Sequence, residues 1–483
     1  MTGDKNHAAP VSHPASRVRS VAVWLLVALG LAGAAVWGLA GPCSAPREAA
    51  LMGGIFVLAA VLWVTEALPL FATSLLVIGL ELVLLANPGG WAGLGFAAGP
   101  APSYREILGL AVDPVLVLFF GGFVLAQAAA KEGVDRAISV WLLRPFGMRP
   151  RYVLLGLMLI TLLFSMWMSN TATTAMMLAL VAPMVASLPA GEPFRKAMVL
   201  GVPFAANIGG MGTPIASPPN AVALGFLQQA GHRVAFLDWL LVAVPLMLGL
   251  AGLAWLLLLR CFPATVGAIR LEPATGPLTR RGWIVVGIFA VTVLLWISDW
   301  LHGLPASVVA LLPAVALTAT GIFTRDDLGR IEWSVLILIA GGVALGAGVQ
   351  RTGLDRIAVQ WLPASDGGGL GLLAGLVLAT MAVGTFMSNT AVANLVLPIG
   401  ISAAAISGPG VGISPVQVGL SIAMAASLAM ALPISTPPNA MAYARGEVAT
   451  RDMARVGLVI GALGALLIIV GGGWVMRFWG VVE

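Results

Sequence analysis

Charged residues are scarce in this 483-residue chain, because Asp, Glu, Lys and Arg together make up only 9% of it. An ordinary soluble domain has about 25%, and a soluble fold cannot cover its surface with so few charges. Apolar residues reach 59%, and the 59 Gly and 31 Pro stand among Leu, Val, Ala, Ile and Met rather than in polar sequence. The composition therefore predicts an all-α membrane protein with many spans, in which Gly and Pro act as hinges and close contacts.

Cysteine and histidine are also rare. The two cysteines, Cys43 and Cys261, exclude a disulfide framework or a cysteine-based metal site as the organising principle. All four histidines lie at the amino terminus or beside charged loops, so none is available inside the membrane as a ligand or base. The net charge of +5 comes from scattered Lys and Arg without interleaved aromatics, which does not indicate a nucleic-acid partner.

The chain begins with a polar segment, residues 1–20, and an uncharged run follows from Val21. This run can cross the roughly 30 Å hydrocarbon layer, whereas the apolar core of a signal peptide has about 7–15 residues. We therefore predict a cytoplasmic tail over 1–20 and a retained transmembrane helix over 21–44. Further uncharged runs that can span the membrane are 49–65, 67–80, 114–130, 240–259, 282–298, 303–324, 334–350 and 456–476.

Two uncharged segments, 152–191 and 367–444, are too long for one crossing, and polar and proline-rich clusters interrupt both. We interpret the start of each as a re-entrant helical hairpin, which turns at a polar tip and leaves on the side it entered. A broken helix follows each hairpin. The predicted hairpins cover 152–188 and 368–406, and the predicted broken helices cover 195–231 and 414–447.

This path gives about eleven transmembrane helices and two hairpins, with a cytoplasmic N-terminus and an extracytoplasmic C-terminus. Cytoplasmic loops are enriched in Lys and Arg, so the basic residues test the path. It places 19 of the 25 inside the cell. We therefore expect a multi-pass protein of the inner or plasma membrane.

Two polar motifs occur twice. The sequence MSNTA at 168–172 returns at 387–391, and SPPNA at 217–221 returns as TPPNA at 436–440, in both cases 219 residues later. The chain is thus predicted to contain two homologous halves. The first hairpin begins after basic residues on the inside and the second after basic residues on the outside, so we expect the halves, 45–260 and 282–483, to form an inverted repeat. This arrangement is typical of secondary transporters.

The repeated clusters carry hydroxyl and amide groups, which both donate and accept hydrogen bonds. At a hairpin tip they lie where two half-helices end. Amino-terminal ends attract anions, whereas carboxyl-terminal ends and carbonyls freed by proline attract a small hard cation such as Na⁺. Neither long uncharged segment contains Lys, Arg or His, so an anion there would be held by dipoles, hydroxyls and co-bound cations.

An intramembrane enzyme and a channel are the competing interpretations. An enzyme would need buried carboxylates, histidines or a base beside Ser169 or Ser388, and the uncharged segments offer only Asp366 at one edge. A channel could contain broken helices, but inverted pairs of them favour alternating access. We therefore expect a transporter, with no catalytic residue and no cofactor.

These motifs, together with WVTEALP at 63–69, resemble the divalent anion:sodium symporter (DASS) family, the solute carrier 13-like di- and tricarboxylate transporters. The resemblance covers nearly the whole chain from about residue 45. It implies a homodimer with scaffold and transport domains, Na⁺ as coupling ion, and an elevator-type cycle for di- or tricarboxylates or sulfate. Sulfate-type members often carry a large soluble insert between the halves, which this chain lacks, so C4-dicarboxylates such as succinate, malate and fumarate are favoured.

The resemblance also assigns segments to domains. It implies scaffold helices over 45–131 and 283–351, arm helices over 132–149 and 352–364, further helices over 237–260 and 453–478, and a cytoplasmic linker over 261–281.

Carried over by motif, the resemblance implies two kinds of site. The substrate contacts would be Ser169, Asn170, Thr171, Ser388, Asn389, Thr390, Thr436 and Pro437. One Na⁺ site would use Ser165, Ser169, Asn170, Gly212 and Ala216, and a second would use Gly384, Met387, Asn389 and Ser435.

The second Na⁺ site departs from the family pattern. Gly384 stands where the first half has Ser165 and where symporters of the family commonly place a hydroxyl. A weak or missing second site leaves open a Na⁺-independent dicarboxylate exchanger, and sulfate or citrate remain alternative substrates.

Overall fold

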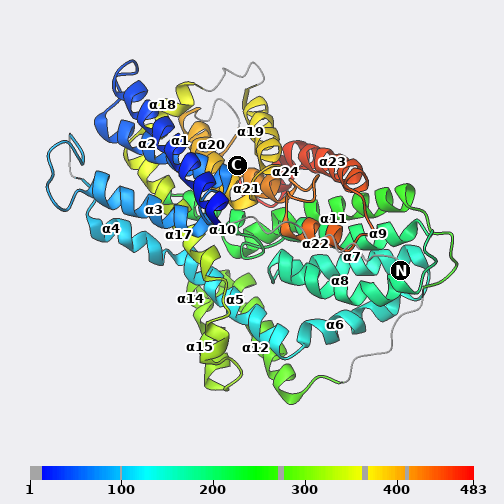
Figure 1. Ribbon diagram of the computed structural model, residues 1–483. Coiled ribbons are helices and arrows are strands. Elements are labelled where there is room, and N and C mark those ends of the chain that lie inside the picture. Colours follow the sequence, from blue (N-terminus) through cyan, green and yellow to red (C-terminus); the bar gives the residue numbers. More distant parts are fainter. Residues whose placement is uncertain (1–13, 98–100, 270–276, 362–367, 408–412, 483) are drawn as a thin grey trace.

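The computed structural model describes residues 14–97, 101–269, 277–361, 368–407 and 413–482, and within these ranges it contains helices and no strands (Figure 1). The first half and its leading helix comprise α1 (Pro14–Ala40), α2 (Arg47–Thr65), α3 (Leu70–Leu80) with the π-helical η1 (Glu81–Ala86), α4 (Tyr104–Gly109), η2 (Leu110–Val112), α5 (Pro114–Lys131), α6 (Val134–Leu143), η3 (Arg144–Phe146), α7 (Pro150–Ser165), α8 (Asn170–Ala186), α9 (Phe194–Gly209), α10 (Pro218–Gln229) and α11 (Phe236–Cys261).

The second half repeats the order of long and broken helices. It comprises α12 (Arg280–Ile297), α13 (Asp299–His302), α14 (Ala306–Val309), α15 (Leu311–Ala319), α16 (Arg325–Leu328), α17 (Trp333–Arg351), α18 (Leu354–Gln360), α19 (Gly368–Gly384), α20 (Asn389–Ser407), α21 (Pro415–Ser427), α22 (Pro437–Ala444), α23 (Thr450–Leu466), η5 (Leu467–Gly471) and α24 (Gly472–Phe478).

Eight helices in the described part of the chain are long and apolar enough to cross a membrane. They are Val21–Ala40, Arg47–Thr65, Tyr104–Lys131, Phe236–Cys261, Arg280–Ile297, Trp333–Arg351, Asn389–Ile406 and Thr450–Phe478. Shorter apolar helices lie between them, among them α7, α8 and α19. A helix of 17 residues is about 25 Å long, which falls short of the roughly 30 Å hydrocarbon layer. Multi-pass membrane insertion follows from these lengths and compositions.

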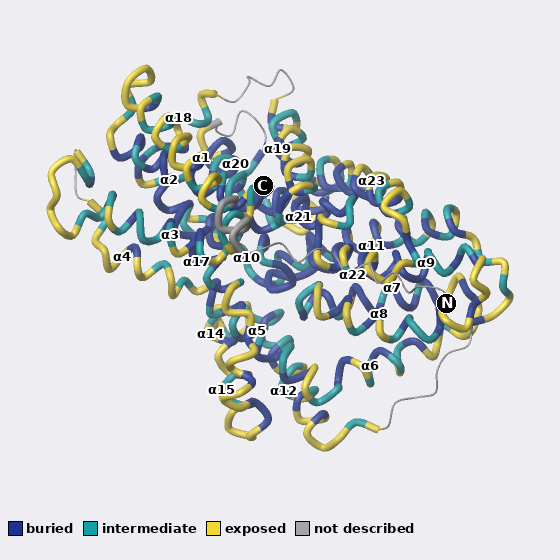
Figure 2. Tube along the Cα trace, in the orientation of Figure 1, coloured by how far each residue is buried: buried dark blue, intermediate teal, exposed yellow. Residues whose placement is uncertain are grey.

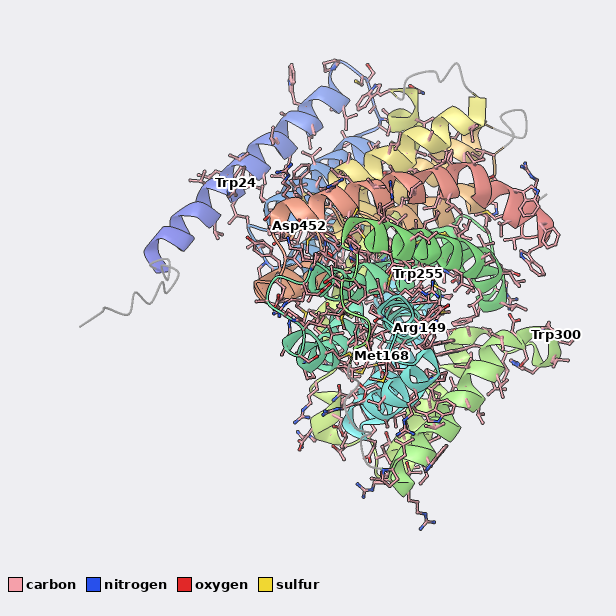
Figure 3. All side chains as sticks on the ribbon, turned by 90° about the vertical axis from the view of Figure 1, so that its right-hand side faces the viewer. Trp24, Arg149, Met168, Trp255, Trp300 and Asp452 are labelled. Atoms are coloured by element: carbon pink, nitrogen blue, oxygen red, sulfur yellow. The ribbon has the colours of Figure 1, made fainter. Side chains whose placement is uncertain are left out.

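Helix α1 leans away from the rest of the molecule, and Trp24 on it is exposed (Figure 3). Its contact with α2 depends on two glycines, because a side chain at Gly53 would meet Leu39 and one at Gly54 would meet Val36. Most of the apolar surface of α1 stays uncovered, as expected for a helix that faces lipid.

The core of the molecule is formed by α9 and α21, which are buried along almost their whole lengths (Figure 2). Each of these two buried helices contacts a short helix of the other half. Helix α22 packs on α9, and α10 packs on α21. At one end of the molecule α12, α14 and α15 gather around α5 (Figure 1). The two halves therefore share one core.

Four ion pairs among the described residues also join the halves, and two of them involve the start of α9. The Arg195 guanidinium donates to both carboxylate oxygens of Glu447 at 2.7 and 3.1 Å, and Lys196 Nζ lies 2.7 Å from Asp452 Oδ2. The hydrogen bonds from Arg195 hold the pKa of Glu447 below its usual range. The start of α9 is thus fixed to the segment that follows α22.

Several helix boundaries differ from those predicted. Helix α1 begins at Pro14 rather than at residue 21, since nothing in 14–20 stops a helix and proline is tolerated in its first turn. Within the run 303–324 the helical part is Ala306–Ala319, labelled α14 and α15 on either side of Ala310, which lies against Gly121. Helix α3 continues through η1 to Ala86, beyond the predicted end at residue 80. Parts of the predicted tail, linker and second arm helix, namely 1–13, 270–276 and 362–364, lie outside the described residues.

Candidate functional site

The turn between α7 and α8, residues 166–169, is here called the first tip. Ser169 adopts an extended conformation and caps α8, because its Oγ accepts a hydrogen bond from the Ala172 N–H at 3.3 Å. The amino-terminal end of a helix carries unpaired N–H groups and a partial positive charge. The first tip therefore presents hydroxyl, amide and N–H groups together.

The interruption between α9 and α10, residues 210–217, is here called the first break. Glycines end α9, and Pro218 and Pro219 occupy the first positions of α10, where missing N–H groups are tolerated. The amide of Asn220 closes the break by donating to the carbonyls of Gly210 and Thr213, both at 2.8 Å. The Thr213 hydroxyl donates to the Met166 carbonyl, which joins the break to the first tip.

Three oxygen atoms converge where the first tip meets α9. Ser165 Oγ lies 2.6 Å from Asn170 Oδ1 and 2.7 Å from the Ala206 carbonyl. A hydroxyl has one hydrogen and can satisfy only one of these two acceptors. An oxygen-rich position of this kind fits a hard cation, which prefers oxygen ligands.

Glycine at position 210 allows this arrangement. A Cβ there would lie 2.6 Å from Asn170 Nδ2 and 3.0 Å from Asn170 Oδ1. Any other residue would push the Asn170 amide away, so the close packing of first tip and first break depends on Gly210.

The second half has the corresponding features. The second tip, residues 385–388, ends with Ser388, whose Oγ accepts a hydrogen bond from the Ala391 N–H at 3.2 Å. In the second break, residues 428–436, the amide of Asn439 donates to the carbonyls of Met430 at 2.7 Å and Leu432 at 3.0 Å. Ser435 Oγ donates to the Thr385 carbonyl at 2.8 Å. Both tips are thus tied to a break by a hydroxyl.

Each break meets the buried helix of the other half through buried polar side chains. Asn207 Nδ2 of α9 lies 3.2 Å from Thr436 Oγ1 and 3.1 Å from Asn439 Oδ1. Ser217 Oγ lies 3.4 Å from Ser427 Oγ. Thr436, predicted as a substrate contact, therefore lies at the contact between the halves.

Several buried oxygen atoms in the hairpins and broken helices take part in no hydrogen bond with the described residues. They include Asn207 Oδ1, Asn220 Oδ1 and Asn389 Oδ1. An unsatisfied buried polar atom is unfavourable by about 1–3 kcal/mol, so such acceptors fit a ligand that offers positive charge.

The predicted site residues do not all share one environment. Ser165 and Asn170 meet directly, and Ser435 reaches the second tip. Gly212 packs against Met166 of the first tip, and Gly384 lies against Ala429 of the second break. Among the predicted substrate contacts Ser169, Asn170, Ser388 and Asn389 are half-buried, Thr390 and Thr436 are buried, and Thr171 and Pro437 are exposed. Ala216 N donates to the Thr213 carbonyl, and Met387 is buried.

Sequence reasoning missed three functional candidates. No repeated motif contains Asn207, Thr213 or Glu332. A polar residue within an apolar helix, as at Asn207, nevertheless indicates a functional position. Glu332 accepts a hydrogen bond from Ser169 Oγ at 3.2 Å, across 163 residues of sequence. Such long-range contacts leave no local pattern.

A cavity of about 550 Å³ lies apart from the tips, between α5, α14 and the connection from α10 to α11. None of the predicted site residues lines it. The tips are the candidate site, because the repeated motifs and the convergent oxygen atoms occur there.

Comparison with known proteins identifies the family. Residues 20–482 match the family described as the sodium:sulfate symporter transmembrane region. An uncharacterized transporter of Haemophilus influenzae is 32% identical over 463 residues, which cover 90% of this chain and 93% of the relative. The sodium-dependent dicarboxylate transporter SdcS of Staphylococcus aureus is 29% identical over 459 residues, which cover 86% of this chain and 85% of SdcS.

The fold is also shared with a solved structure. The YdaH transporter of Alcanivorax borkumensis superposes with a TM-score of 0.56 at 15% identity, covering 86% of this chain and 99% of that chain. The chain therefore belongs to the sodium:sulfate symporter family, the divalent anion:sodium symporters, and is a multi-pass membrane transporter rather than an enzyme.

Proposed function

We propose that the protein imports C4-dicarboxylates such as succinate, malate and fumarate together with Na⁺. The observation that carries this proposal is the pair of tips, each with a helix amino terminus, hydroxyls and an amide, in segments without one basic side chain. A dianion taken out of water needs positive charge, and helix ends supply only about half a unit each. Co-transported Na⁺ supplies the rest. The relative SdcS, named as a sodium-dependent dicarboxylate transporter, supports this substrate class.

The substrate carboxylates would be held by both tips. Ser169, Asn170 and Thr171 would contact one carboxylate, and Ser388, Asn389 and Thr390 the other, with Thr436 and Pro437 between them. A four-carbon diacid matches two such groups, because it carries one anionic end for each tip.

One Na⁺ would bind at Ser165, Ser169 and Asn170 with backbone oxygens near Gly212 and Ala216. The three oxygen atoms that converge on Ser165 support this position. A second Na⁺ would use Asn389, Ser435 and backbone near Gly384 and Met387, where the buried Asn389 Oδ1 offers an acceptor.

Transport would follow an elevator-type alternating-access cycle in a homodimer. The two helix pairs α7–α8 and α19–α20 would be re-entrant hairpins of an inverted repeat and move with the broken helices, while the helices within 45–131 and 283–351 form the scaffold. The amphipathic α6 and α18 would be the arms between these parts. The amino terminus would be cytoplasmic and the carboxyl terminus extracytoplasmic, with eleven crossings.

A Na⁺-independent exchanger is the second candidate, and one residue favours it. Gly384 places no hydroxyl where Ser165 stands in the first half. Sulfate and citrate remain alternative substrates of the same site.

Uptake of labelled succinate into proteoliposomes tests the proposal. An inward Na⁺ gradient should drive uptake into empty vesicles, and a K⁺ gradient should not. Uptake that ignores Na⁺ but requires unlabelled dicarboxylate inside would refute the symporter and establish the exchanger. Asn170→Ala and Asn389→Ala should each abolish uptake while the purified dimer stays folded, and near-normal uptake by either variant would refute the site.

A further inference from the structure

The first tip, which carries Ser169, packs against an aromatic stack through Trp167. Trp167, two residues earlier, stacks on Trp296 of α12 with ring centroids 6.3 Å apart, and on Phe236 of α11 at 6.1 Å. Trp296 Nε1 donates to the Ala306 carbonyl at 2.9 Å. The tip that carries Ser169 therefore lies against fixed aromatic rings.

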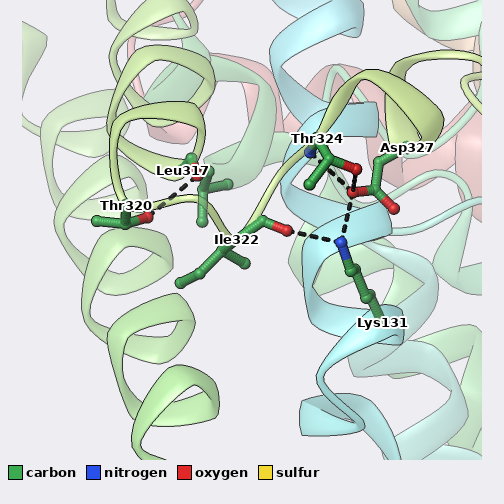
Figure 4. Close-up of polar contacts among 6 residues, drawn as sticks. All are labelled: Lys131, Leu317, Thr320, Ile322, Thr324 and Asp327. Carbon is green, nitrogen blue, oxygen red and sulfur yellow. Dashed lines mark hydrogen bonds and ion pairs between the residues drawn. The ribbon is translucent and has the colours of Figure 1, made fainter.

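Contacts with α5 hold the segment that carries Glu332. Lys131 Nζ at the end of α5 donates to Asp327 Oδ2 at 2.6 Å and to the Ile322 carbonyl at 2.9 Å (Figure 4). Burial raises the pKa of Asp327, but the hydrogen bonds from Lys131 and Thr324 outweigh burial and lower that pKa to about 2. Trp333, next to Glu332, donates Nε1 to the Leu328 carbonyl at 3.0 Å and packs on Phe120.

The residue that caps α8 contacts the residue that precedes α17. Ser169 caps α8, a helix of 17 residues, and Glu332 immediately precedes α17, a helix of 19 residues. Ser169 Oγ donates to Glu332 Oε1 at 3.2 Å. The ion pairs among the described residues are Lys131–Asp327, Arg195–Glu447, Lys196–Asp452 and Arg351–Glu106, so Glu332 takes part in none of them. The Glu332 carboxylate therefore accepts a hydrogen bond from Ser169, a donor that the proposed function assigns to the substrate.

We propose that Glu332 is a substrate-displacing residue, whose carboxylate takes the Ser169 hydrogen bond that a substrate carboxylate accepts in the loaded state. This inference rests on the proposed function. The single hydrogen of Ser169 cannot serve both carboxylates, and the like charges of Glu332 and a bound dianion repel each other. Glu332 therefore weakens anion binding in the conformation in which the first tip lies against α17, and speeds release there.

Neutral replacement of Glu332 tests this role in transport. Glu332→Gln keeps the size of the side chain and removes the charge, and the residue is exposed, so the fold should persist. We expect KM for succinate to fall about three- to tenfold, the range that like-charge repulsion of about one kcal/mol produces, and the maximal rate to fall with it because release slows. Asp326→Asn removes an exposed charge from the same connection without touching Ser169 and should leave both constants unchanged. Unchanged KM in Glu332→Gln, or the same change in Asp326→Asn, would overturn the inference.

A labelling experiment separates this inference from the substrate assignment. In a background with Cys43 and Cys261 replaced by Ser, Ser169→Cys is labelled with an anionic and with a cationic methanethiosulfonate reagent. Adding Glu332→Gln should raise the ratio of the anionic to the cationic labelling rate several-fold, whereas adding Asp326→Asn should not. If succinate uptake fails but the ratio shifts, the substrate assignment is refuted and the control of anion access by Glu332 stands. An unshifted ratio would refute that control whatever the transport result.

Discussion

Asn207 Nδ2 donates to Asn439 Oδ1 at 3.1 Å and so connects α9 of the first half with α22, the helix that follows the second break. The same amide lies 3.2 Å from Thr436 Oγ1. All three side chains are buried. One side chain therefore couples the core helix of one half to the break that carries predicted substrate contacts in the other.

Asn207→Ala should weaken both folding and transport. It leaves the buried Asn439 Oδ1 without a donor and removes one of the two donors to Thr436 Oγ1, which should lower the free energy of unfolding by about 1–3 kcal/mol. Thermal unfolding in detergent and succinate uptake measure the two effects. Gln228→Ala on the exposed face of α10 is the control and should change neither. Wild-type uptake by Asn207→Ala would show that this link between the halves is dispensable.

Ser165→Ala should weaken Na⁺ dependence specifically. It removes one of three converging oxygen atoms, and loss of one such ligand should raise the half-saturating Na⁺ concentration about five- to thirtyfold, corresponding to about 1–2 kcal/mol. Thr161→Ala, one turn earlier, is the matched control because the buried Thr161 hydroxyl donates only to the Leu157 carbonyl of its own helix. Equal Na⁺ activation curves for the two variants would contradict the first Na⁺ site.

Gly210→Ala should impair transport while preserving the fold. The added Cβ would lie 2.6 Å from Asn170 Nδ2, the end of a side chain that can move away. Asn170 would leave the position where it meets Ser165, and uptake should fall at least tenfold, like that of a variant lacking a ligand. Gly252→Ala is the control, because its Cβ would meet nothing within 4 Å. Normal uptake by Gly210→Ala would mean that the position of Asn170 is not critical.

The Lys131–Asp327 pair should make stability depend on pH in a defined direction. The pKa of Asp327 in the folded protein is lowered from 3.8 to about 2, so its ionised form stabilises the fold. This contribution should be complete above about pH 4 and be lost as the pH falls through about 2. Asp327→Asn should therefore be less stable than the wild type by about 1–3 kcal/mol at pH 7, and the difference should shrink below pH 4. A difference that does not change between pH 7 and pH 3 would contradict this account.

The sequence predicts the helical class and the places where helices are interrupted, because these features have local causes. Prolines and glycines end α9 and begin α10, and Ser169 and Ser388 have the residue type that caps a helix. Family membership also follows from the doubled motifs. A repeated polar motif inside an apolar segment can be recognised without knowing where each span begins and ends.

The contacts that join distant segments could not be predicted, because they depend on packing. Asn207 meets Thr436 across 229 positions and Ser169 meets Glu332 across 163, and neither pair shares a motif. The helix formed by the run 303–324 is likewise shorter than its uncharged sequence, because it covers only Ala306–Ala319. Uncharged sequence indicates a span but does not show where its helix begins and ends.

Binding of succinate to the purified protein at increasing Na⁺ concentration tests the central claim, that a dianion is held without a basic side chain because cations bind with it. Isothermal titration calorimetry, at constant ionic strength with K⁺ as replacement, should show an affinity that rises steeply with Na⁺ and no measurable binding in K⁺ alone. Equal affinity in the two salts would contradict the claim.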